Sequence, residues 1–211
     1  MRIRAKFTKI GNVKFVGHLD TVRLFQRAIK VAGIPIAYSE GFNPHSKVYF
    51  ALPLPVGMES VGEYIEIKTK TDVAPADLKD SLNAVLPKGI ELLDCDEAEE
   101  GAPTLMSQVD AAIYEIIIKN LDNADKIVNV LEQPSIVIAK RNKKKKWVEQ
   151  EIKPLILDYA ITEDEEGIIL TAKIKAGSRS NLNPELMLKA IFGSEFENIT
   201  YDIKRKKLFL V

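Results

Sequence analysis

The 211-residue sequence predicts an α+β protein built from two ferredoxin-like (βαββαβ) domains in tandem. Strand and helix signals in the first half follow the order β-α-β-β-α-β, and the second half repeats that plan. A segment rich in acids, glycine and proline separates the two halves, as in a linker. We therefore predict a first domain at 1–98, a linker at 99–110 and a second domain at 111–211.

The first domain opens with a strand and an amphipathic helix. Ile3, Ala5 and Phe7 alternate with charged residues, a period of two that is typical of a strand. Apolar residues then recur at three-to-four spacing over 18–32, which predicts a helix that ends at Gly33. The remaining signals are strands at 36–38, 48–52, 62–68 and 90–94, and a helix at 75–86.

The second domain repeats the order of elements without matching residues. Its predicted helices and strands are helices at 122–131 and 184–191, and strands at 113–119, 135–139, 146–161, 168–174 and 201–211. A lysine-rich turn separates the second and third of these strands.

Several classes of protein are excluded by what the chain lacks. The single cysteine, Cys95, forms no internal disulfide and cannot supply an all-cysteine metal or iron–sulfur site. No run of about 18 apolar residues is present, so we expect no membrane association. The N-terminus lacks the apolar core of a signal peptide, which favours the cytoplasm. Nucleotide-binding glycine motifs and the C-x-x-x-C-x-x-C cluster motif are absent, so we expect no cofactor in this chain, and we assign no residue as a metal ligand.

The net charge of zero hides three regions of different sign. Residues 1–60 carry nine Lys/Arg against three Asp/Glu, residues 61–135 carry six against sixteen, and residues 136–211 carry fifteen against eleven. Such separation allows a basic face for an anionic partner, unless folding interleaves the regions.

The segment YSEGFNPHSK at 38–47 is the most unusual stretch of the first domain. Its glycine and Asn43-Pro44 favour a turn. Phe42 either tucks into the core or stacks on a ligand. Asn43, His45 and Lys47 offer donors to a phosphate or carboxylate. The alternative is an ordinary connection between two strands.

The start of the first helix is the second candidate. Donors at a helix N-terminus favour anions, and Arg23 and Arg27 lie one and two turns beyond Asp20, on the same helix face. The two histidines, His18 and His45, together with Asp20 also suggest acid–base or metal-assisted chemistry. A solvated arginine face is the structural alternative.

The second domain carries a dense basic turn and one further arginine. A lysine-rich turn followed by an aromatic residue suits a nucleic-acid backbone and a stacking base, although a solvated hairpin is the usual alternative. Arg179 precedes a helix in a segment that is favourable to anions. The candidates here are Arg141, Lys143, Lys144, Lys145, Lys146, Trp147 and Arg179.

These segments resemble the radical-SAM-linked protein family over about residues 1–70. The matching residues are Arg2-Ile3-Arg4, Lys9-Ile10-Gly11, Phe15, His18-Leu19-Asp20, Arg27, Ala32-Gly33-Ile34-Pro35, Tyr38-Ser39, Gly41-Phe42-Asn43-Pro44-His45, Leu52-Pro53-Leu54-Pro55-Val56-Gly57 and Gly62-Glu63-Tyr64. The family commonly has Pro-Lys or Pro-Arg where this chain has Ser46-Lys47. Its members occur alone or joined to a radical SAM protein, so the resemblance implies a radical SAM protein as partner.

Three hypotheses follow from the sequence. The first is a non-catalytic accessory protein that binds RNA (tRNA or rRNA) or another anionic substrate, with the 38–47 segment and the His18 helix start in one cleft. The second is an enzyme that uses His18, Asp20 and His45 on a phosphorylated substrate. The third is a protein-binding adaptor without a ligand. The oligomeric state does not follow from the sequence.

Overall fold

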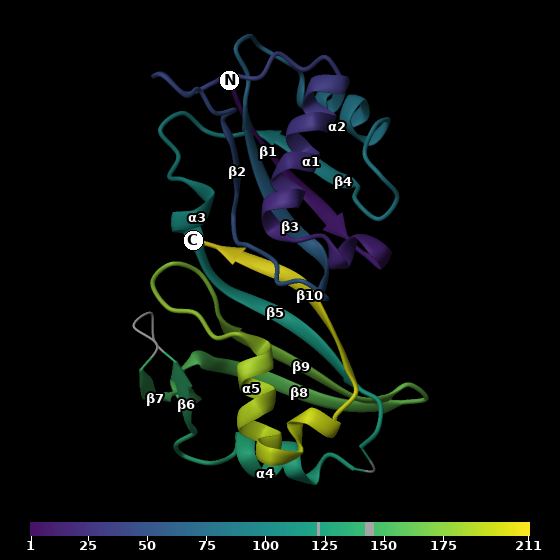
Figure 1. Ribbon diagram of the computed structural model, residues 1–211, viewed down its shortest axis with the longest axis vertical. Coiled ribbons are helices and arrows are strands. Elements are labelled where there is room, and N and C mark those ends of the chain that lie inside the picture. The colour runs from purple at the N-terminus through teal and green to yellow at the C-terminus, as the bar shows by residue number, and fades with distance from the viewer. Residues whose placement is uncertain (122, 142–145) are drawn as a thin grey trace. The chain divides into compact units, whose positions relative to one another are not determined.

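The computed structural model describes residues 1–121, 123–141 and 146–211 and shows a mixed α+β protein (Figure 1). The chain divides into two compact units. The first holds Met1–Val109 and Lys204–Val211, and the second holds Asp110–Ile203. Within the described residues, no helix is long and apolar enough to cross a membrane.

The first unit contains an antiparallel sheet in the order β4-β1-β3, with two further strands on the free side of β3. Short β2 pairs with the C-terminal part of β3, and Lys204 and Arg205 of β10 pair in parallel with Glu59 and Ser60 at the start of β3. The elements of this unit are β1 (Arg2–Lys9), α1 (His18–Val31), β2 (Val48–Phe50), β3 (Glu59–Lys68), α2 (Pro75–Asn83), β4 (Leu92–Glu97), α3 (Leu105–Gln108) and the end of β10 (Tyr201–Leu210).

The core of the first unit lies between its sheet and the helices α1 and α2. Alternate residues of β1 are buried, as the period of two predicts. The rings of Phe7, Phe25 and Phe50 pack edge to face, with centroids 5.1–5.9 Å apart. These three rings join β1, α1 and β2, so they hold the middle of α1 against the sheet.

Two predicted features of the first unit differ from the structure. The predicted linker at 99–110 contains α3, because Thr104 caps it and Leu105 is buried. The second domain was predicted to hold all of 111–211, whereas Lys204–Val211 belong to the first unit. A strand of alternating charge and apolar residues does not reveal which sheet it joins.

The second unit has the strand order β10-β5-β9-β8, and its helices α4 and α5 pack on each other. Strands β6 and β7 form a separate two-stranded hairpin. The elements are β5 (Val109–Ile118), α4 (Asp125–Leu131), β6 (Val137–Arg141), β7 (Trp147–Glu151), β8 (Ile156–Asp164), β9 (Gly167–Lys175) and α5 (Pro184–Phe192).

The predicted strand at 146–161 is two strands. The 3-10 helix Lys153–Leu155 interrupts it, and the buried side chain of Ile152 anchors that turn. Pro154 lacks a backbone N–H and therefore cannot continue a ladder of hydrogen bonds. The hairpin is consequently an insertion before β8 and not the beginning of it.

Candidate functional site

A cationic groove of about 790 Å³ lies where α1 ends and the 38–47 segment begins. We call this the Arg27 groove. Its charged and aromatic lining comes from α1 and from two segments beside it. Those side chains are Arg27, Lys30, Tyr38, His45 and Lys70.

Local geometry builds this groove. Gly33 takes a φ of +68°, which ends α1 and turns the chain back along the sheet. Isolated bridges then pair Ile36 with Thr69 and Tyr38 with Ser46. The Gln26 amide donates to Ser46 Oγ at 2.9 Å, so the returning segment is attached to α1.

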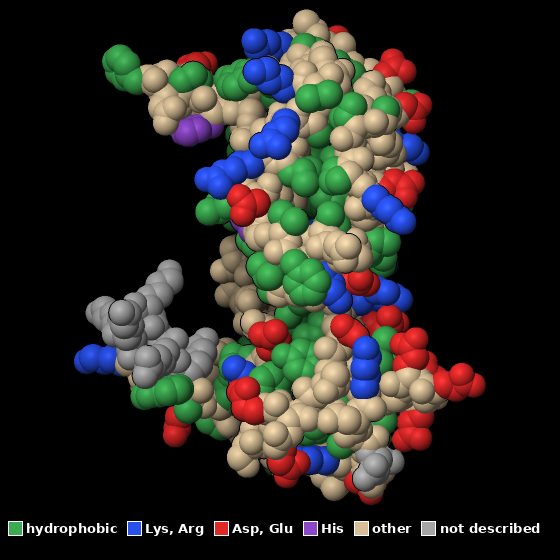
Figure 2. Space-filling view, turned by 45° about the vertical axis from the view of Figure 1, so that its right-hand side comes forward, with side chains coloured by type: hydrophobic (Ala, Val, Ile, Leu, Met, Phe, Trp, Pro, Cys, Tyr) green, Lys and Arg blue, Asp and Glu red, His purple; other side chains and the backbone are tan. Residues whose placement is uncertain are grey.

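The groove is strongly positive. Among its lining residues that the structure describes, three are Lys or Arg and none is acidic. The Lys70 ammonium lies 5.6 Å from the centre of the Tyr38 ring, a cation–π contact. Figure 2 shows Lys and Arg side chains gathered along one side of the first unit. The groove therefore suits a ligand that carries several negative charges.

Phe42 is fully exposed at the tip of the same segment. The structure therefore excludes the first of the two sequence-based alternatives, in which the Phe42 side chain packs into the core. Ser39 Oγ accepts a hydrogen bond from the His45 N–H at 2.9 Å, which closes the loop that carries Phe42. Phe42 does not itself line the groove, but Tyr38, Pro44 and His45 of the same segment do. An exposed ring in this segment is a surface on which a base or another ring can stack.

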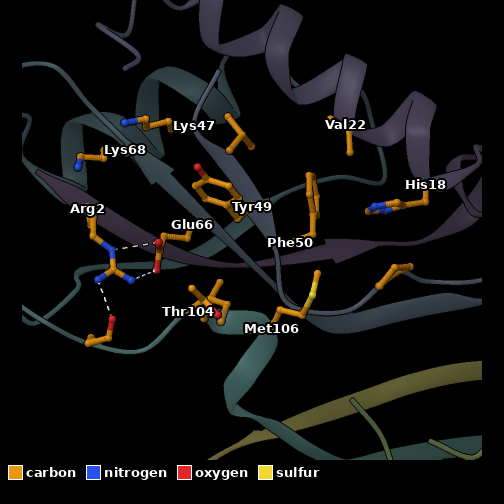
Figure 3. A pocket seen from close by; sticks show the side chains of 14 residues that line it. Arg2, His18, Val22, Lys47, Tyr49, Phe50, Glu66, Lys68, Thr104 and Met106 are labelled. Atoms are coloured by element: carbon orange, nitrogen blue, oxygen red, sulfur yellow. Dashed lines mark hydrogen bonds and ion pairs between the residues drawn. The ribbon is translucent and has the colours of Figure 1, made fainter. Parts of the chain in front are cut away.

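His18 lines a different cavity, of about 600 Å³, which we call the His18 pocket (Figure 3). Its walls come from β1, α1, β2, β3 and the segment that leads into α3. The His18 ring packs edge to face on Phe50, with centroids 5.5 Å apart. Lys47 also lines this pocket and does not line the Arg27 groove.

Buried charges surround His18. Lys9 is 2% exposed and donates from Nζ to the Val16 carbonyl at 2.6 Å. Burial lowers the pKa of Lys9, while the nearby Glu63 acts against that change. The pKa of His18 is also lowered, first by burial and then by the Lys9 charge, against an opposing effect of Glu63. The His18 imidazole therefore favours its neutral form and can accept a proton or a hydrogen bond.

The predicted single cleft divides into separate hollows. His18 and Lys47 line one, and Arg27 and His45 line the other. Asp20 forms an exposed ion pair with Arg23 at 2.9 Å. Across the part of the chain that the structure describes, no three His, Cys, Asp or Glu side chains are grouped to hold a metal ion.

The candidates of the second unit are exposed where the structure describes them. Lys146 and Trp147 are exposed at the start of β7, and Arg179 is exposed before α5. The backbone of Arg141 pairs with Trp147. The predicted sites Lys143, Lys144 and Lys145 lie outside the described residues.

In the first unit, the predicted site Asn43 is exposed and is next to Phe42 in the sequence.

Sequence reasoning missed several residues that line these hollows. Lys30 was visible on the polar side of α1, three residues beyond Arg27. Lys70 gave no signal, because only the bridge between Ile36 and Thr69 brings it to the groove. Arg2 and Lys68 were missed for the same reason, since strand pairing places them beside Lys47.

Fold and site together define a mixed α+β protein with a cationic groove and a separate pocket in its first unit. A family model described as "Uncharacterized protein conserved in bacteria (DUF2344)" matches residues 2–184, and the chain belongs to this family. That description includes no activity and no partner, so the radical SAM association stays a prediction. No curated protein matches the chain.

Among solved structures, a chain in the crystal structure of a Cbf5-Nop10-Gar1 complex is similar, with a TM-score of 0.52 and 9% identity. The match covers 98% of this chain and 48% of the other, so our chain spans about half its length. At this identity the likeness concerns the fold alone.

Two further structures have lower scores. An unknown protein from Galdieria sulphuraria gives 0.28 at 11% identity, covering 97% of both chains. DyPB from Rhodococcus jostii RHA1 gives 0.27 at 11% identity, covering 99% of this chain and 90% of that one. These two scores are too low to bear on the fold.

Proposed function

We propose that this protein is a non-catalytic accessory protein that binds single-stranded segments of RNA through the Arg27 groove. One observation carries the proposal: three cations and an exposed Tyr38 line a hollow in which no described lining residue is acidic. The exposed Phe42 ring lies in the segment that forms one side of the groove.

The physical basis is charge neutralisation combined with stacking. Each Lys or Arg that neutralises a phosphate releases a counterion, so affinity falls as salt rises. Aromatic rings add stacking energy that tolerates any base. Arg27, Lys30 and Lys70 supply the charge, while Tyr38 and Phe42 supply the rings.

The test is fluorescence anisotropy with a labelled single-stranded RNA of about 12 nucleotides. Three phosphate contacts predict a slope of about −2 for log K against log salt, and about 20-fold weaker binding at 200 mM than at 50 mM salt. Replacing Arg27, Lys30 and Lys70 by alanine should remove the part of the salt slope that these three contacts contribute. Phe42→Ala should weaken binding without changing the slope.

The matched control removes the same charge elsewhere in the first unit. A variant with Lys6, Lys79 and Lys88 changed to alanine should keep the wild-type salt slope. Equal losses in the two triple variants would mean that net charge alone attracts the RNA, and the groove would then have no role. Binding that is flat with salt would also contradict the proposal.

The basic hairpin is proposed as a second region of backbone contact. This part rests on the sequence of Arg141, Lys143–Lys146 and Trp147, and on the exposure of Lys146 and Trp147. Changing Lys143–Lys146 to alanine should reduce the salt slope further in the groove variant. An unchanged slope would restrict RNA contact to the first unit.

We also propose that the partner is a radical SAM protein in the cytoplasm, and that both units follow the ferredoxin-like plan. The partner rests on the motif resemblance, and the lone cysteine means that any cluster belongs to the partner. Affinity purification after nuclease treatment should still recover a radical SAM protein, and recovery of none would contradict this partner.

The proposal that both units follow the ferredoxin-like plan is supported by the strand orders β4-β1-β3-β2 and β10-β5-β9-β8.

A further inference from the structure

The His18 pocket has two chemically different ends (Figure 3). Lys47, Lys68 and Arg2 gather near one end, and His18 lies at the other, with Phe50 between them. The volume of about 600 Å³ falls within the range of pockets that take small molecules.

The first end of the pocket carries a net positive charge. Glu66 is the acidic residue there, and two arginines neutralise it. Arg2 contacts both carboxylate oxygens at 2.8–3.0 Å, and Arg4 contacts one at 3.0 Å. Two guanidinium groups on one carboxylate leave an excess of one positive charge.

Lys47 and Lys68 add two further charges. Within the described parts of the chain, no carboxylate forms an ion pair with either ammonium group. The Arg2 guanidinium already has hydrogen-bond partners, because it contacts Glu66 and also donates to the Ala102 carbonyl at 2.8 Å. The two lysines are therefore the groups available to an anion, while Arg2 and Arg4 cancel the charge of Glu66.

The middle of the pocket is mostly apolar, although Tyr49 and Thr104 also line it. Its apolar walls come from α1, β2, α3 and the segment after β2, and the side chains are Val22, Val48, Phe50, Pro53, Leu105 and Met106. Phe50 and Leu105 are buried in the unit, so this wall is held in place by the core. An apolar body lying here would lose contact with water, which favours binding.

We infer that the His18 pocket binds a small amphipathic anion. The ligand has one anionic head at Lys47 and Lys68, and an aromatic or aliphatic body along Phe50 towards His18. The half-buried imidazole of His18 offers one hydrogen bond to a polar group at the far end of that body. This site is separate from the RNA groove, because none of its residues lines the groove.

A pair of fluorescent probes tests the inference. 1-Anilinonaphthalene-8-sulfonate has an apolar aromatic body and one anionic group, and N-phenyl-1-naphthylamine has the same rings without the charge. Titration of the full chain with the sulfonate should give saturable binding of one probe per chain. The double variant Lys47→Gln/Lys68→Gln should weaken sulfonate binding at least about 10-fold. It should change binding of the uncharged probe by less than about 2-fold.

The matched control is Lys30→Gln/Lys70→Gln, which removes equal charge from the Arg27 groove. This variant should keep sulfonate affinity and lose RNA affinity, so failure of one proposal is distinguishable from failure of the other. Equal weakening of both probes by Lys47→Gln/Lys68→Gln would overturn the anionic end. Sulfonate affinity that is unchanged in that variant would overturn it as well.

A blocking variant tests the apolar middle. Met106 is half exposed on α3, so Met106→Trp can fill the pocket without altering the buried core. It should abolish binding of both probes while leaving the melting temperature within a few degrees of wild type. Retention of both probes by a folded Met106→Trp protein would place the binding elsewhere and overturn the inference.

Discussion

At the scale of single residues, the environment of His18 is set by groups that are distant in sequence. Lys9 approaches it from the end of β1 and Glu63 from the middle of β3. Burial and the Lys9 charge outweigh Glu63, so the pKa of His18 is lower than its ordinary 6.5. The sequence predicted His18 as a site residue from its place at a helix start. The lowered pKa of its imidazole could be inferred only from the folded structure.

The shifted pKa predicts a dependence of stability on pH. Below about pH 6.5 the unfolded chain binds a proton at His18 that the folded chain binds less readily. The free energy of unfolding should therefore fall as pH drops from 7 towards 5. Urea unfolding of wild type and His18→Gln at both pH values measures this, and the variant should show the weaker dependence. An equal dependence in the two proteins would contradict the assignment to His18.

At the scale of elements, the turn that leads into β4 depends on one glycine. Gly89 has a φ of +97°, and a Cβ added there would lie 2.3 Å from the Ile10 carbonyl oxygen. The same two residues are joined by a hydrogen bond from the Ile10 N–H to the Gly89 carbonyl at 2.9 Å. Close approach of the two backbones therefore leaves no room for a side chain.

Gly89→Ala should destabilise the protein by more than the roughly 1–3 kcal/mol expected from an unfavourable backbone conformation. The control is Gly101→Ala, because Gly101 has a φ of +76° but no atom within 4 Å of the added Cβ. Chemical denaturation of the two variants separates conformational strain from the clash. Equal losses in the free energy of unfolding would mean that the backbone at Ile10 shifts away from the added Cβ at no measurable cost.

Elements were predicted best where periodicity was strong and local. The helix predicted at 18–32 is α1 at His18–Val31, and the strand predicted at 168–174 lies within β9. The predicted strand at 146–161 was wrong because a run of apolar and charged residues hides the turn at Pro154. The short helix α3 was missed because its four residues are fewer than a helical pattern needs.

At the scale of the whole molecule, the last strand completes the first unit. Arg205 on β10 is 1% exposed and contacts both oxygens of the Glu63 carboxylate at 2.9–3.0 Å, although 142 residues separate the two. It also donates to the Pro53 carbonyl at 3.2 Å. The unit therefore depends on residues at both ends of the chain.

Removing one member of this pair should be strongly destabilising. Arg205→Met leaves the buried Glu63 without its partner, and we expect a loss of about 3–5 kcal/mol in the free energy of unfolding. The control is Lys204→Met, whose ion pair with Glu59 is partly exposed and should contribute less than about 1 kcal/mol. Urea unfolding measures both, and a loss below about 1 kcal/mol for Arg205→Met would show that Glu63 finds another partner.

The sequence by itself determined the mixed α+β class, most helices and strands, and the segments that carry polar chemistry. These follow from local periodicity and turn residues, which act over a few neighbours. The tertiary structure decided which of those segments meet. It separated His18 and Lys47 from Arg27 and His45, brought Lys70 to the groove and placed Arg205 against Glu63. Such contacts depend on strand pairing between distant parts of the chain, and periodicity carries no information about that pairing.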